Sequence, residues 1–376
     1  MKATKSLYSL PWLLLFPLIA HAGDVPGTYA KYQWDSTVTS LTSIDFGINV
    51  EADPGYRANV LWSNRFVLSG TGDIGRAGME DNANLGPGFV FTVQGATHYK
   101  SGAAGSYCTV HGGASPRVTC RLPYHWLNTL NYQFHVAYEG GQWLGATVTD
   151  PHTQQSFKLG SILTGATSIT PQGMVGRTTY REAKSPNSNC YNQPYSEAVI
   201  GAPTGNGGQY ASTVSSAGTL ATCAGFSNTS IITYTPGSDQ LNGFGNLPRG
   251  EVVGALSGLC ADAGDGKTSG AAITTQTCDE KSEGQAWVFA KDGTVRLQSN
   301  LCLDVANADP SQGAVVIADA CNGSAGQYWT LQGFGNLIQS NVSGYCMTEG
   351  SAGAQLTMQP CTADNIWLVP QIPVLP

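Results

Sequence analysis

The last third of the sequence repeats one pattern three times, and this repeat constrains the fold more than any other feature. Each copy has a cysteine, a second cysteine 15 to 19 residues later, and a tryptophan six to nine residues further on. The copies begin at Cys260-Ala261-Asp262, Cys302-Leu303-Asp304 and Cys346-Met347-Thr348. A unit of about 40 residues cannot bury its own apolar face, so three copies are expected to share one core.

The copies end on a second shared pattern, which reads Gln285-Ala286-Trp287, Gln327-Tyr328-Trp329 and Asn365-Ile366-Trp367. The paired cysteines and the Gln-x-Trp triplets at this period resemble the ricin-type β-trefoil lectin family, over about residues 250–370. The resemblance implies three four-stranded repeats around a pseudo-threefold axis, with the three tryptophans in the shared core.

The resemblance also implies a shallow site for a galactose-type sugar on each working repeat. In the family, an Asp two residues after the first cysteine accepts bonds from adjacent hydroxyls, and an aromatic two residues before the second cysteine stacks on the ring. The Gln of Gln-x-Trp, the residue before it and a polar residue four before the second cysteine complete the site. The first repeat keeps Asp262 and Gln285, with Thr274 as the polar residue, but Gln276 fills the aromatic slot and Gly284 precedes Gln285.

The second repeat keeps Asp304 and Gln327, but its other slots hold Ile317, Asp319 and Gly326. The third repeat has Thr348, Gln359 and Asn365 in place of the Asp, the aromatic and the Gln. No repeat keeps the stacking aromatic. The candidate carbohydrate-binding residues are therefore Asp262, Thr274, Gln285, Asp304 and Gln327. An alternative is that Asp262 and Asp304 only cap local turns.

The N-terminus resembles an export signal. Lys2 and Lys5 precede an apolar run from Leu10 to Ile19, and Ala20-His21-Ala22 fits a cleavage site. We therefore expect residues 1–22 to be a signal peptide and the mature chain, extracellular or periplasmic, to begin at Gly23. An uncleaved membrane anchor is the alternative. No other stretch is long and apolar enough to cross a membrane.

The sequence has ten cysteines, and none lies in the expected signal. An oxidising compartment favours disulfides. The spacings suggest local pairs, although sequence alone does not fix connectivity: Cys108 with Cys120, Cys190 with Cys223, Cys260 with Cys278, Cys302 with Cys321, and Cys346 with Cys361. Neither a CxxC motif nor a Cys/His zinc spacing occurs, so we expect no metal site and no cofactor.

The charge balance argues against a nucleic-acid or anionic-membrane partner. The chain has 18 basic and 25 acidic residues, and loss of Lys2 and Lys5 leaves 16 against 25. Residues 250–376 have 4 basic and 12 acidic residues, and residues 23–249 have 12 and 13. Phosphate backbones and anionic lipid surfaces require the opposite balance.

Residues 23–240 show strand patterns without helical periodicity. Residues 132–138 and 143–149 alternate in polarity around a Gly140-Gly141 turn, and a turn at 150–153 precedes Phe157-Lys158-Leu159. This is the pattern of an antiparallel meander. Further strands are expected at 46–50 and 59–68. An all-β chain follows, with a β-sandwich or jelly roll at 23–240, a linker at 241–249 and the trefoil at 250–370.

Three parts of this first domain resemble a family of uncharacterised secreted bacterial β-sandwich domains. They are the glycine-rich Cys108–Cys120 hairpin, the Cys-Arg-Leu-Pro-Tyr segment at 120–124, and the meander with Trp143 and Thr149-Asp150. The resemblance covers most of residues 45–185, implies a jelly-roll-like fold and supplies no catalytic residue.

We find no catalytic motif such as GxSxG, SxxK or a P-loop. Glu80 and Asp81, in the polar segment 78–86, are the best candidates for a carboxylate pair or a calcium site, but a solvated turn is favoured there. The mature histidines, expected on loops or sheet faces, are His98, His111, His125, His135 and His152. Five aromatics offer a sugar platform or, as we favour, core packing: Tyr29, Tyr32, Trp34, Trp62 and Trp126.

The leading hypothesis is a secreted, non-catalytic carbohydrate-binding protein whose partner is a glycan or polysaccharide. The first alternative is a polysaccharide-degrading enzyme, a glycoside hydrolase or a lyase, with a catalytic sandwich and a trefoil that targets it. Two carboxylates across one groove would favour the enzyme. The second alternative is a toxin or adhesin subunit that binds host glycans.

Overall fold

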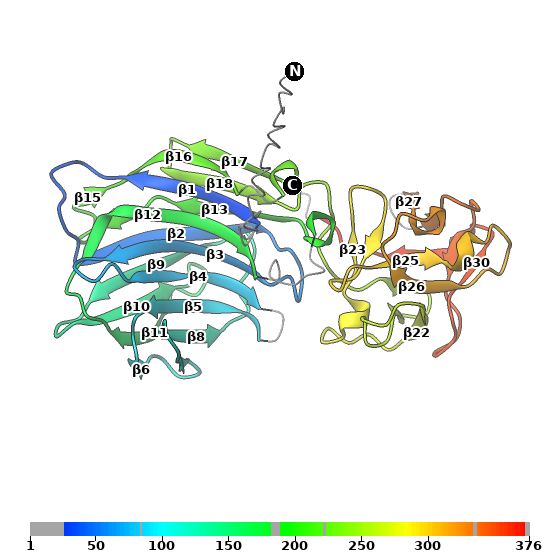
Figure 1. Cartoon of the computed structure of the whole chain (residues 1–376), viewed down its shortest axis with the longest axis horizontal. Helices are drawn as coiled ribbons and strands as arrows, with labels where there is room; N and C mark the ends of the chain where they lie inside the picture. Colours follow the sequence, from blue (N-terminus) through cyan, green and yellow to red (C-terminus); the bar gives the residue numbers. More distant parts are fainter. Residues whose placement is uncertain (1–25, 83–84, 182–188, 221–222, 334–336, 373–376) are drawn as a thin grey trace, which may run out of the picture.

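The computed structural model describes residues 26–82, 85–181, 189–220, 223–333 and 337–372. The expected signal peptide at 1–22 and the start at Gly23 lie outside these residues. The described chain is nearly all β, and none of its helices is long and apolar enough to cross a membrane. Two bodies lie side by side along the long axis, a larger two-layered one and a smaller one built from the last third of the sequence (Figure 1).

One layer of the larger body is an eight-stranded antiparallel sheet. Its order is β16 (Thr213–Thr219), β1 (Gly27–Gln33), β12 (Ile169–Tyr180), β3 (Val60–Leu68), β4 (Ile74–Asn82), β5 (Gly86–Gln94), β8 (Arg117–Pro123) and β7 (Tyr107–His111). The expected hairpin is confirmed as β7 and β8, in which Cys108 lies directly opposite Cys120.

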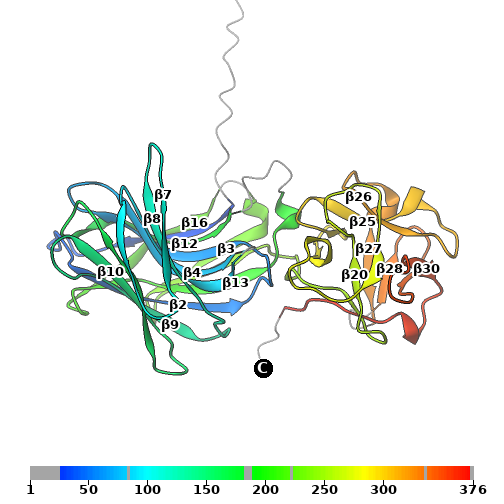
Figure 2. The same ribbon diagram turned by 90° about the horizontal axis from the view of Figure 1, so that it is seen from below.

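The second layer is a ten-stranded sheet, and Figure 2 shows the two layers from below. Its main order is β17 (Ser227–Ile232), β18 (Gly237–Asn242), β13 (Ser196–Gly201), β2 (Ser43–Ala52), β9 (Asn131–Tyr138), β10 (Trp143–Thr149), β11 (Ser156–Leu163) and β6 (His98–Ser101). In addition, β14 (Thr204–Gly205) pairs with β2, and β15 (Tyr210–Ala211) pairs with β14. The predicted meander is confirmed as β9, β10 and β11.

The two layers bury one apolar core, as the alternating strand patterns require. Phe46 stacks on Phe134 across strands β2 and β9, with ring centroids 5.3 Å apart. Tyr32, Trp34, Trp62 and Trp126 are buried in this core, so they form no platform on the surface. Burial of such large side chains is a main source of the sandwich's stability.

The smaller body contains three small antiparallel sheets with one core of their own. The first sheet has the order β22 (Thr274–Gln276), β20 (Cys260–Asp262), β19 (Val253–Gly254) and β31 (Trp367–Leu368). The second has the order β21 (Ala271–Ala272), β26 (Val316–Ala320), β25 (Leu301–Val305), β24 (Val295–Arg296) and β23 (Val288–Phe289). The third has the order β27 (Trp329–Gln332), β28 (Leu337–Ser340), β29 (Cys346–Thr348) and β30 (Thr357–Gln359). This is the expected trefoil.

The tryptophan of each repeat makes the same contact in all three copies. Each indole is buried, and its N–H donates at 2.9 Å to the carbonyl of the residue after the first cysteine. The three pairs are Trp287 with Ala261, Trp329 with Leu303, and Trp367 with Met347. A buried indole must find such an acceptor, so these bonds fix where each ring sits in the shared core.

The amide two residues before each tryptophan forms a second threefold contact. Gln285, Gln327 and Asn365 are each buried and each end a 3-10 turn, η4 (Glu283–Gln285), η6 (Ala325–Gln327) and η7 (Ala363–Asn365). In each, the amide oxygen accepts from the backbone N–H that follows the second cysteine, at 2.7 to 3.0 Å. The amide N–H groups donate to the side chain two residues after the first cysteine, at 2.7 to 2.9 Å. We call this set of contacts the amide clamp.

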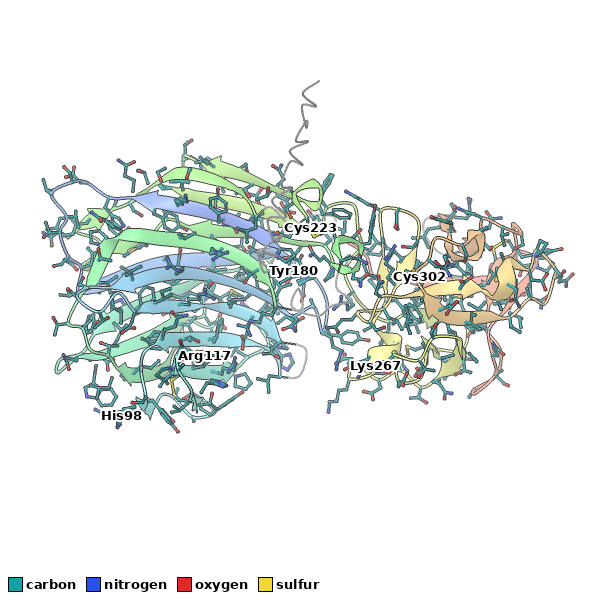
Figure 3. All side chains as sticks on the ribbon, in the orientation of Figure 1. His98, Arg117, Tyr180, Cys223, Lys267 and Cys302 are labelled. Carbon is teal, nitrogen blue, oxygen red and sulfur yellow. A yellow bond between two sulfur atoms is a disulfide. The ribbon has the colours of Figure 1, made fainter. Side chains whose placement is uncertain are left out.

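The ten cysteines form the five expected pairs, and no described cysteine is free. Cys223 and Cys302, labelled in Figure 3, belong to one pair in the sandwich and one in the trefoil. The three trefoil disulfides span 15 to 19 residues, and each joins the two ends of the segment that the amide clamp also ties. Loops of this length contribute about 3 kcal/mol each by restricting the unfolded chain.

Arg249 joins the two bodies at the segment expected to link them. Its side chain is 1% exposed, and its guanidinium donates to the carbonyls of Arg57 and Asn192 at 2.7 Å each. Its backbone N–H donates to Pro54 O at 2.7 Å. On the trefoil side, the backbone N–H of Leu247 donates to Phe289 O. The segment is therefore packed against both bodies and is not a free tether.

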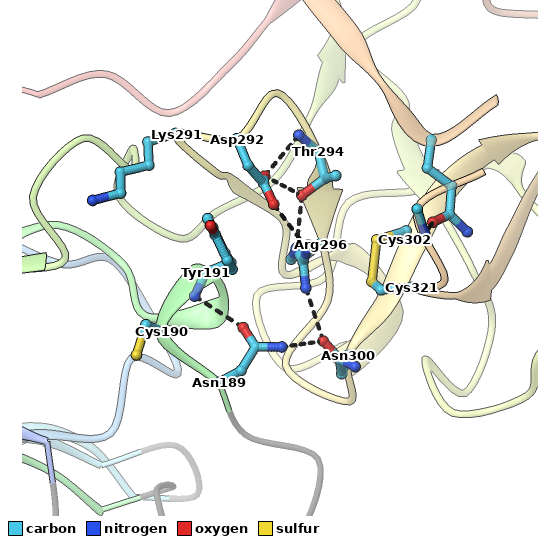
Figure 4. A network of polar contacts seen from close by, with 12 residues as sticks. Asn189, Cys190, Tyr191, Lys291, Asp292, Thr294, Arg296, Asn300, Cys302 and Cys321 are labelled. Carbon is cyan, nitrogen blue, oxygen red and sulfur yellow. Dashed lines mark hydrogen bonds and ion pairs between the residues drawn. A yellow bond between two sulfur atoms is a disulfide. The ribbon is translucent and has the colours of Figure 1, made fainter. Parts of the chain in front are cut away.

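A second polar network crosses the junction (Figure 4). Asn189 of the sandwich donates to Asn300 of the trefoil at 2.6 Å, and Arg296 donates to the same Asn300 oxygen at 3.0 Å. Arg296 also pairs with Asp292 at 3.0 Å and lies over the ring of Tyr191, 4.9 Å from its centroid. These contacts orient the first two repeats against the sandwich.

We predict that Arg249→Met lowers the free energy of unfolding by about 2–4 kcal/mol, because two backbone carbonyls lose a charged donor in a buried site. We expect calorimetry to show one coupled transition for the wild type and separate transitions of the two bodies for Arg249→Met. Lys281→Met, at an exposed position, is the control and should leave the melting profile unchanged. A single unshifted transition in Arg249→Met would contradict this role.

We predict that Gln327→Leu destabilises the trefoil by about 3 kcal/mol, because the buried Gln327 amide is lost as the shared acceptor of the Asn322 and Gly323 backbone N–H groups and as a donor to Asp304. The melting temperature should fall by roughly 10 °C. Gln332→Leu, at an exposed position, should shift it by less than about 2 °C. Equal melting temperatures for the two variants would rule out the amide clamp as a source of stability.

Candidate functional site

The first repeat presents the most accessible of the candidate carboxylates. Asp262 ends β20 and is partly exposed, and β22 places Thr274 directly opposite it. One carboxylate oxygen of Asp262 accepts from Gly264 N at 2.6 Å, and the other accepts from Gln285 at 2.7 Å. A carboxylate has about four lone-pair positions. Two therefore remain after the turn and the clamp are satisfied.

Gln285 lies beside Asp262 but has no N–H left for a ligand. Its amide nitrogen donates to Asp262 and to Thr277 O, at 2.7 and 3.0 Å, and its oxygen accepts from Asp279 N. A primary amide has two N–H donors, and both are used. Gln285 therefore positions the carboxylate, which is a role distinct from direct contact with a sugar.

The slot before the clamp residue is closed by packing in the first two repeats. A Cβ atom at Gly284 would lie 2.4 Å from Gly264 O and 2.7 Å from an Asp262 oxygen. A Cβ atom at Gly326 would lie 2.3 Å from an Asp304 oxygen. Only glycine fits so close to a carboxylate. The Asn that the family resemblance places in this slot is therefore sterically excluded in both repeats.

The second repeat holds the same group of residues in a more buried form. Asp304 is 5% exposed, and burial raises the pKa of its carboxyl group, while bonds from Gln327 and Ser324 lower it. One oxygen accepts from Gln327 at 2.9 Å and from Ser324 at 3.2 Å. The other oxygen is buried and has no hydrogen-bond donor within the described part of the chain. Ile317 lies opposite Asp304 where the first repeat has Thr274, so this site is both covered and less polar.

The third repeat keeps the clamp and has no carboxylate. Asn365 donates to the Thr348 hydroxyl at 2.8 Å, and that hydroxyl donates to Cys346 O. The residues in the three aromatic slots are polar and hold neighbouring side chains. Gln276 donates to Thr274, Asp319 accepts from Ser269, and Gln359 accepts from Gln312. None of the three slots that the family resemblance assigns to the stacking aromatic therefore holds a ring.

In the sandwich, the structure separates Glu80 from Asp81. The solvated turn predicted around them is wrong, since both residues lie in β4 and are 2% and 3% exposed. Their side chains point to opposite faces of the sheet, as alternation along a strand requires. Glu80 pairs with Arg121 at 2.7 Å and with Arg181 at 2.6 Å on the outer face.

The five histidines do not gather into a metal site. The described residues contain a single close group of three possible ligands, Glu251 with Cys260 and Cys278, and both cysteines are in a disulfide. His135 pairs with Asp45 at 2.6 Å on the outer face of the ten-stranded sheet. The hydrogen bond to Asp45 raises the pKa of this histidine, and burial opposes the shift.

Sequence reasoning missed a group of acids on that same outer face, Glu51, Glu197 and Asp239. They come from three adjacent strands, β2, β13 and β18. Burial, followed by the charges of Glu197 and Glu51, raises the pKa of Asp239 to about 6. A groove of about 570 Å³ lies beside them, and Asp45, Glu51 and Gln133 are among its lining residues. The alternation in residues 45–51 places Asp45 and Glu51 on one face, but nothing in the sequence shows which later strands lie beside them.

Comparisons with known proteins concern the trefoil. Residues 248–366 match the family model of the ricin-type beta-trefoil lectin domain. Beta-galactoside-specific lectin 3 of Viscum album is 28% identical over 110 residues, covering 29% of this chain and 18% of that protein. Beta-galactoside-specific lectin 4 of the same plant is 24% identical over 156 residues, covering 40% and 29%. The chain thus spans less than a third of the length of these relatives.

Among solved structures, the agglutinin from Abrus precatorius is 15% identical and covers 89% of this chain and 99% of its own, with a TM-score of 0.28. The family match coincides with the three clamped repeats and ends one residue before Trp367. Residues 248–366 are a ricin-type β-trefoil lectin domain.

Proposed function

We propose that this protein is a secreted carbohydrate-binding protein that holds a glycan at the first repeat of its trefoil, through Asp262. The observation that supports it most is the geometry of that carboxylate. Asp262 is accessible, held by Gln285 and Gly264 from one side, and keeps lone pairs for two hydroxyl donors. A preorganised acceptor of this kind suits two adjacent hydroxyls of a sugar ring.

The other two repeats are less suited than the first to bind a sugar. Asp304 is buried beneath Gly326, and Thr348 supplies no charge. The first repeat also lies against the sandwich, because Arg57 pairs with Glu283 at 2.8 Å and donates to Lys281 O at 3.0 Å. Glu283 opens the η4 turn that ends at Gln285. The sandwich therefore helps to fix the loop that positions Asp262.

Secretion is part of the proposal. Five disulfides without a free cysteine among the described residues suit an oxidising compartment. The basic and then apolar N-terminus supplies an export signal in the sequence. The proposed units remain the sandwich at 23–240, the junction at 241–249 and the trefoil at 250–370.

We predict that the mature protein binds galactose-containing glycans on an array, and that Asp262→Asn weakens binding by roughly 10- to 100-fold, because charge-assisted bonds to the sugar are lost. Titration calorimetry with a β-galactoside measures the change. Asp265→Asn is the matched control, since Asp265 is exposed, lies three residues away and holds only its own turn. Binding unaffected by Asp262→Asn, in a variant that melts normally, would reject this site.

The acids on the ten-stranded sheet favour one second candidate, a polysaccharide-degrading enzyme. A carboxyl group with a pKa near 6 beside an open groove is suited to general acid catalysis. In this function, Asp239 donates a proton to a glycosidic oxygen. Burial, with the charges of Glu197 and Glu51, favours the protonated form of Asp239, and Tyr195 donates to Glu197 at 2.7 Å.

This second function predicts that reducing ends are released from a polysaccharide, and that the rate falls as the pH rises through about 6, where Asp239 loses its proton. Asp239→Asn should abolish the release, and Asp35→Asn, in an exposed turn, should not. A carboxyl group whose pKa is raised by folding destabilises the folded state only at a pH above its pKa in the unfolded chain. Asp239→Asn should therefore stabilise the fold by about 1 kcal/mol above pH 6, after allowance for solvent screening, and have little effect near pH 4. No release at any pH would dismiss the enzyme.

A further inference from the structure

The outer face of the eight-stranded sheet concentrates most of the protein's arginines. The whole sequence has nine, and six of them lie on or beside strands β3, β4, β8 and β12 of this face: Arg65, Arg76, Arg117, Arg121, Arg177 and Arg181. The chain as a whole carries a formal charge of −7. This concentration therefore runs against the balance of the rest of the protein.

The strand register places like charges next to one another. Arg65 and Arg76 are direct partners across β3 and β4, and Arg177 lies opposite Ser63, two residues along β3 from Arg65. Like charges opposite one another destabilise a sheet. Burial, with the charges of Arg177, Arg65 and Arg181, lowers the pKa of Arg76 to about 10. A sheet selected for stability alone would not place arginines at these positions.

The compensating charge within the described residues is small. Glu80 pairs with Arg121 and Arg181, and none of the described residues lining the adjacent groove is a carboxylate. Arg65 donates to Gly173 O at 3.0 Å, a neutral acceptor. The face therefore has an excess of guanidinium groups, which an anionic ligand would neutralise.

A groove of about 720 Å³ runs along this face. Arg76, Arg117, Arg121 and Arg181 line it, and Arg117 is labelled in Figure 3. Thr92 and Thr119 lie between them, with the Thr92 hydroxyl donating to the Thr119 hydroxyl at 3.1 Å. The groove thus combines planar charged donors with hydroxyl groups, on rigid strands that keep their spacing.

We propose that this groove binds an acidic polysaccharide, one whose sugars carry carboxylate or sulfate groups. Guanidinium groups recognise such planar or tetrahedral anions with paired hydrogen bonds. The threonine hydroxyls suit the neutral hydroxyls of the same sugars. The described residues that line the groove include His111 but no Phe, Tyr or Trp, whereas single-stranded nucleic acids are held largely by base stacking on such rings. The proposal does not depend on the trefoil site.

The charge of the sandwich is also polarised, since the acids Glu51, Glu197 and Asp239 lie on the outer face of the other sheet. An anionic chain is therefore repelled from one face and attracted to the opposite one. Fields of this kind orient a charged ligand before contact and weaken as salt rises. We expect binding to fall steeply as NaCl is raised from about 20 to about 300 mM, because the screening length then shortens roughly fourfold.

The test titrates the full mature chain with oligogalacturonate, which carries carboxylates, and with heparin-derived oligosaccharides, which carry sulfates. Neutral dextran and single-stranded DNA are run in parallel. We expect at least one acidic oligosaccharide to bind and dextran not to bind. Arg76→Gln and Arg117→Gln should each weaken binding about tenfold, and neither residue holds Glu80. Lys100→Gln, on the other sheet, is the matched control and should bind as the wild type does.

Two further readouts keep the outcomes distinct. Arg76→Gln should melt at or above the wild-type temperature, because a like-charge contact is removed, so a loss of binding is not a loss of fold. Asp262→Asn should bind the acidic oligosaccharide normally, which separates this groove from the trefoil site. No binding at low salt, binding unaffected by both Arg76→Gln and Arg117→Gln, or tighter binding of DNA than of either oligosaccharide would overturn the proposal.

Discussion

The amide clamp and the indole bond beside it determine what the trefoil can be and what it can bind. Trp287 and Gln285 both hold the strand that begins at Cys260, one through a backbone carbonyl and the other through Asp262. The same two contacts recur with Trp329 and Gln327. Each repeat is short and buries little by itself, so these bonds and the disulfides help to define its shape within the shared core.

The clamp also explains why the three candidate sites differ. In the first two repeats, the amide N–H groups of the clamp donate to the carboxylate and to a backbone carbonyl, so only the aspartate is left to bond a sugar. In the first repeat, the Asp262 side chain is partly exposed, and the clamp holds its carboxylate in position as a hydrogen-bond acceptor. Where Gly326 and Ser324 cover Asp304, the same bonds stabilise a buried acid and leave one oxygen without a donor among the described residues. The three repeats of one domain therefore share a fold but differ in their capacity to bind a ligand.

Much of the architecture was predictable from the sequence, because local patterns determine it. The Cys and Trp spacing predicted three repeats, and the alternation at 132–149 predicted the meander now seen as β9 and β10. The roles of single polar residues were harder to predict. Glu80 read as part of a solvated turn because its partners, Arg121 and Arg181, lie 41 and 101 positions away along the chain. Neither the acidic face nor the arginine face was predictable, since both depend on which distant strands are neighbours.

The central claim is that one trefoil site, at Asp262, carries the glycan. A crystal structure of the mature protein soaked with a β-galactoside tests it most directly. We expect density for one sugar in the first repeat, with two of its hydroxyls on the Asp262 carboxylate, and none at Asp304 or Thr348. A sugar bound at either of those repeats with Asp262 unoccupied, or no sugar on the trefoil at all, would contradict it.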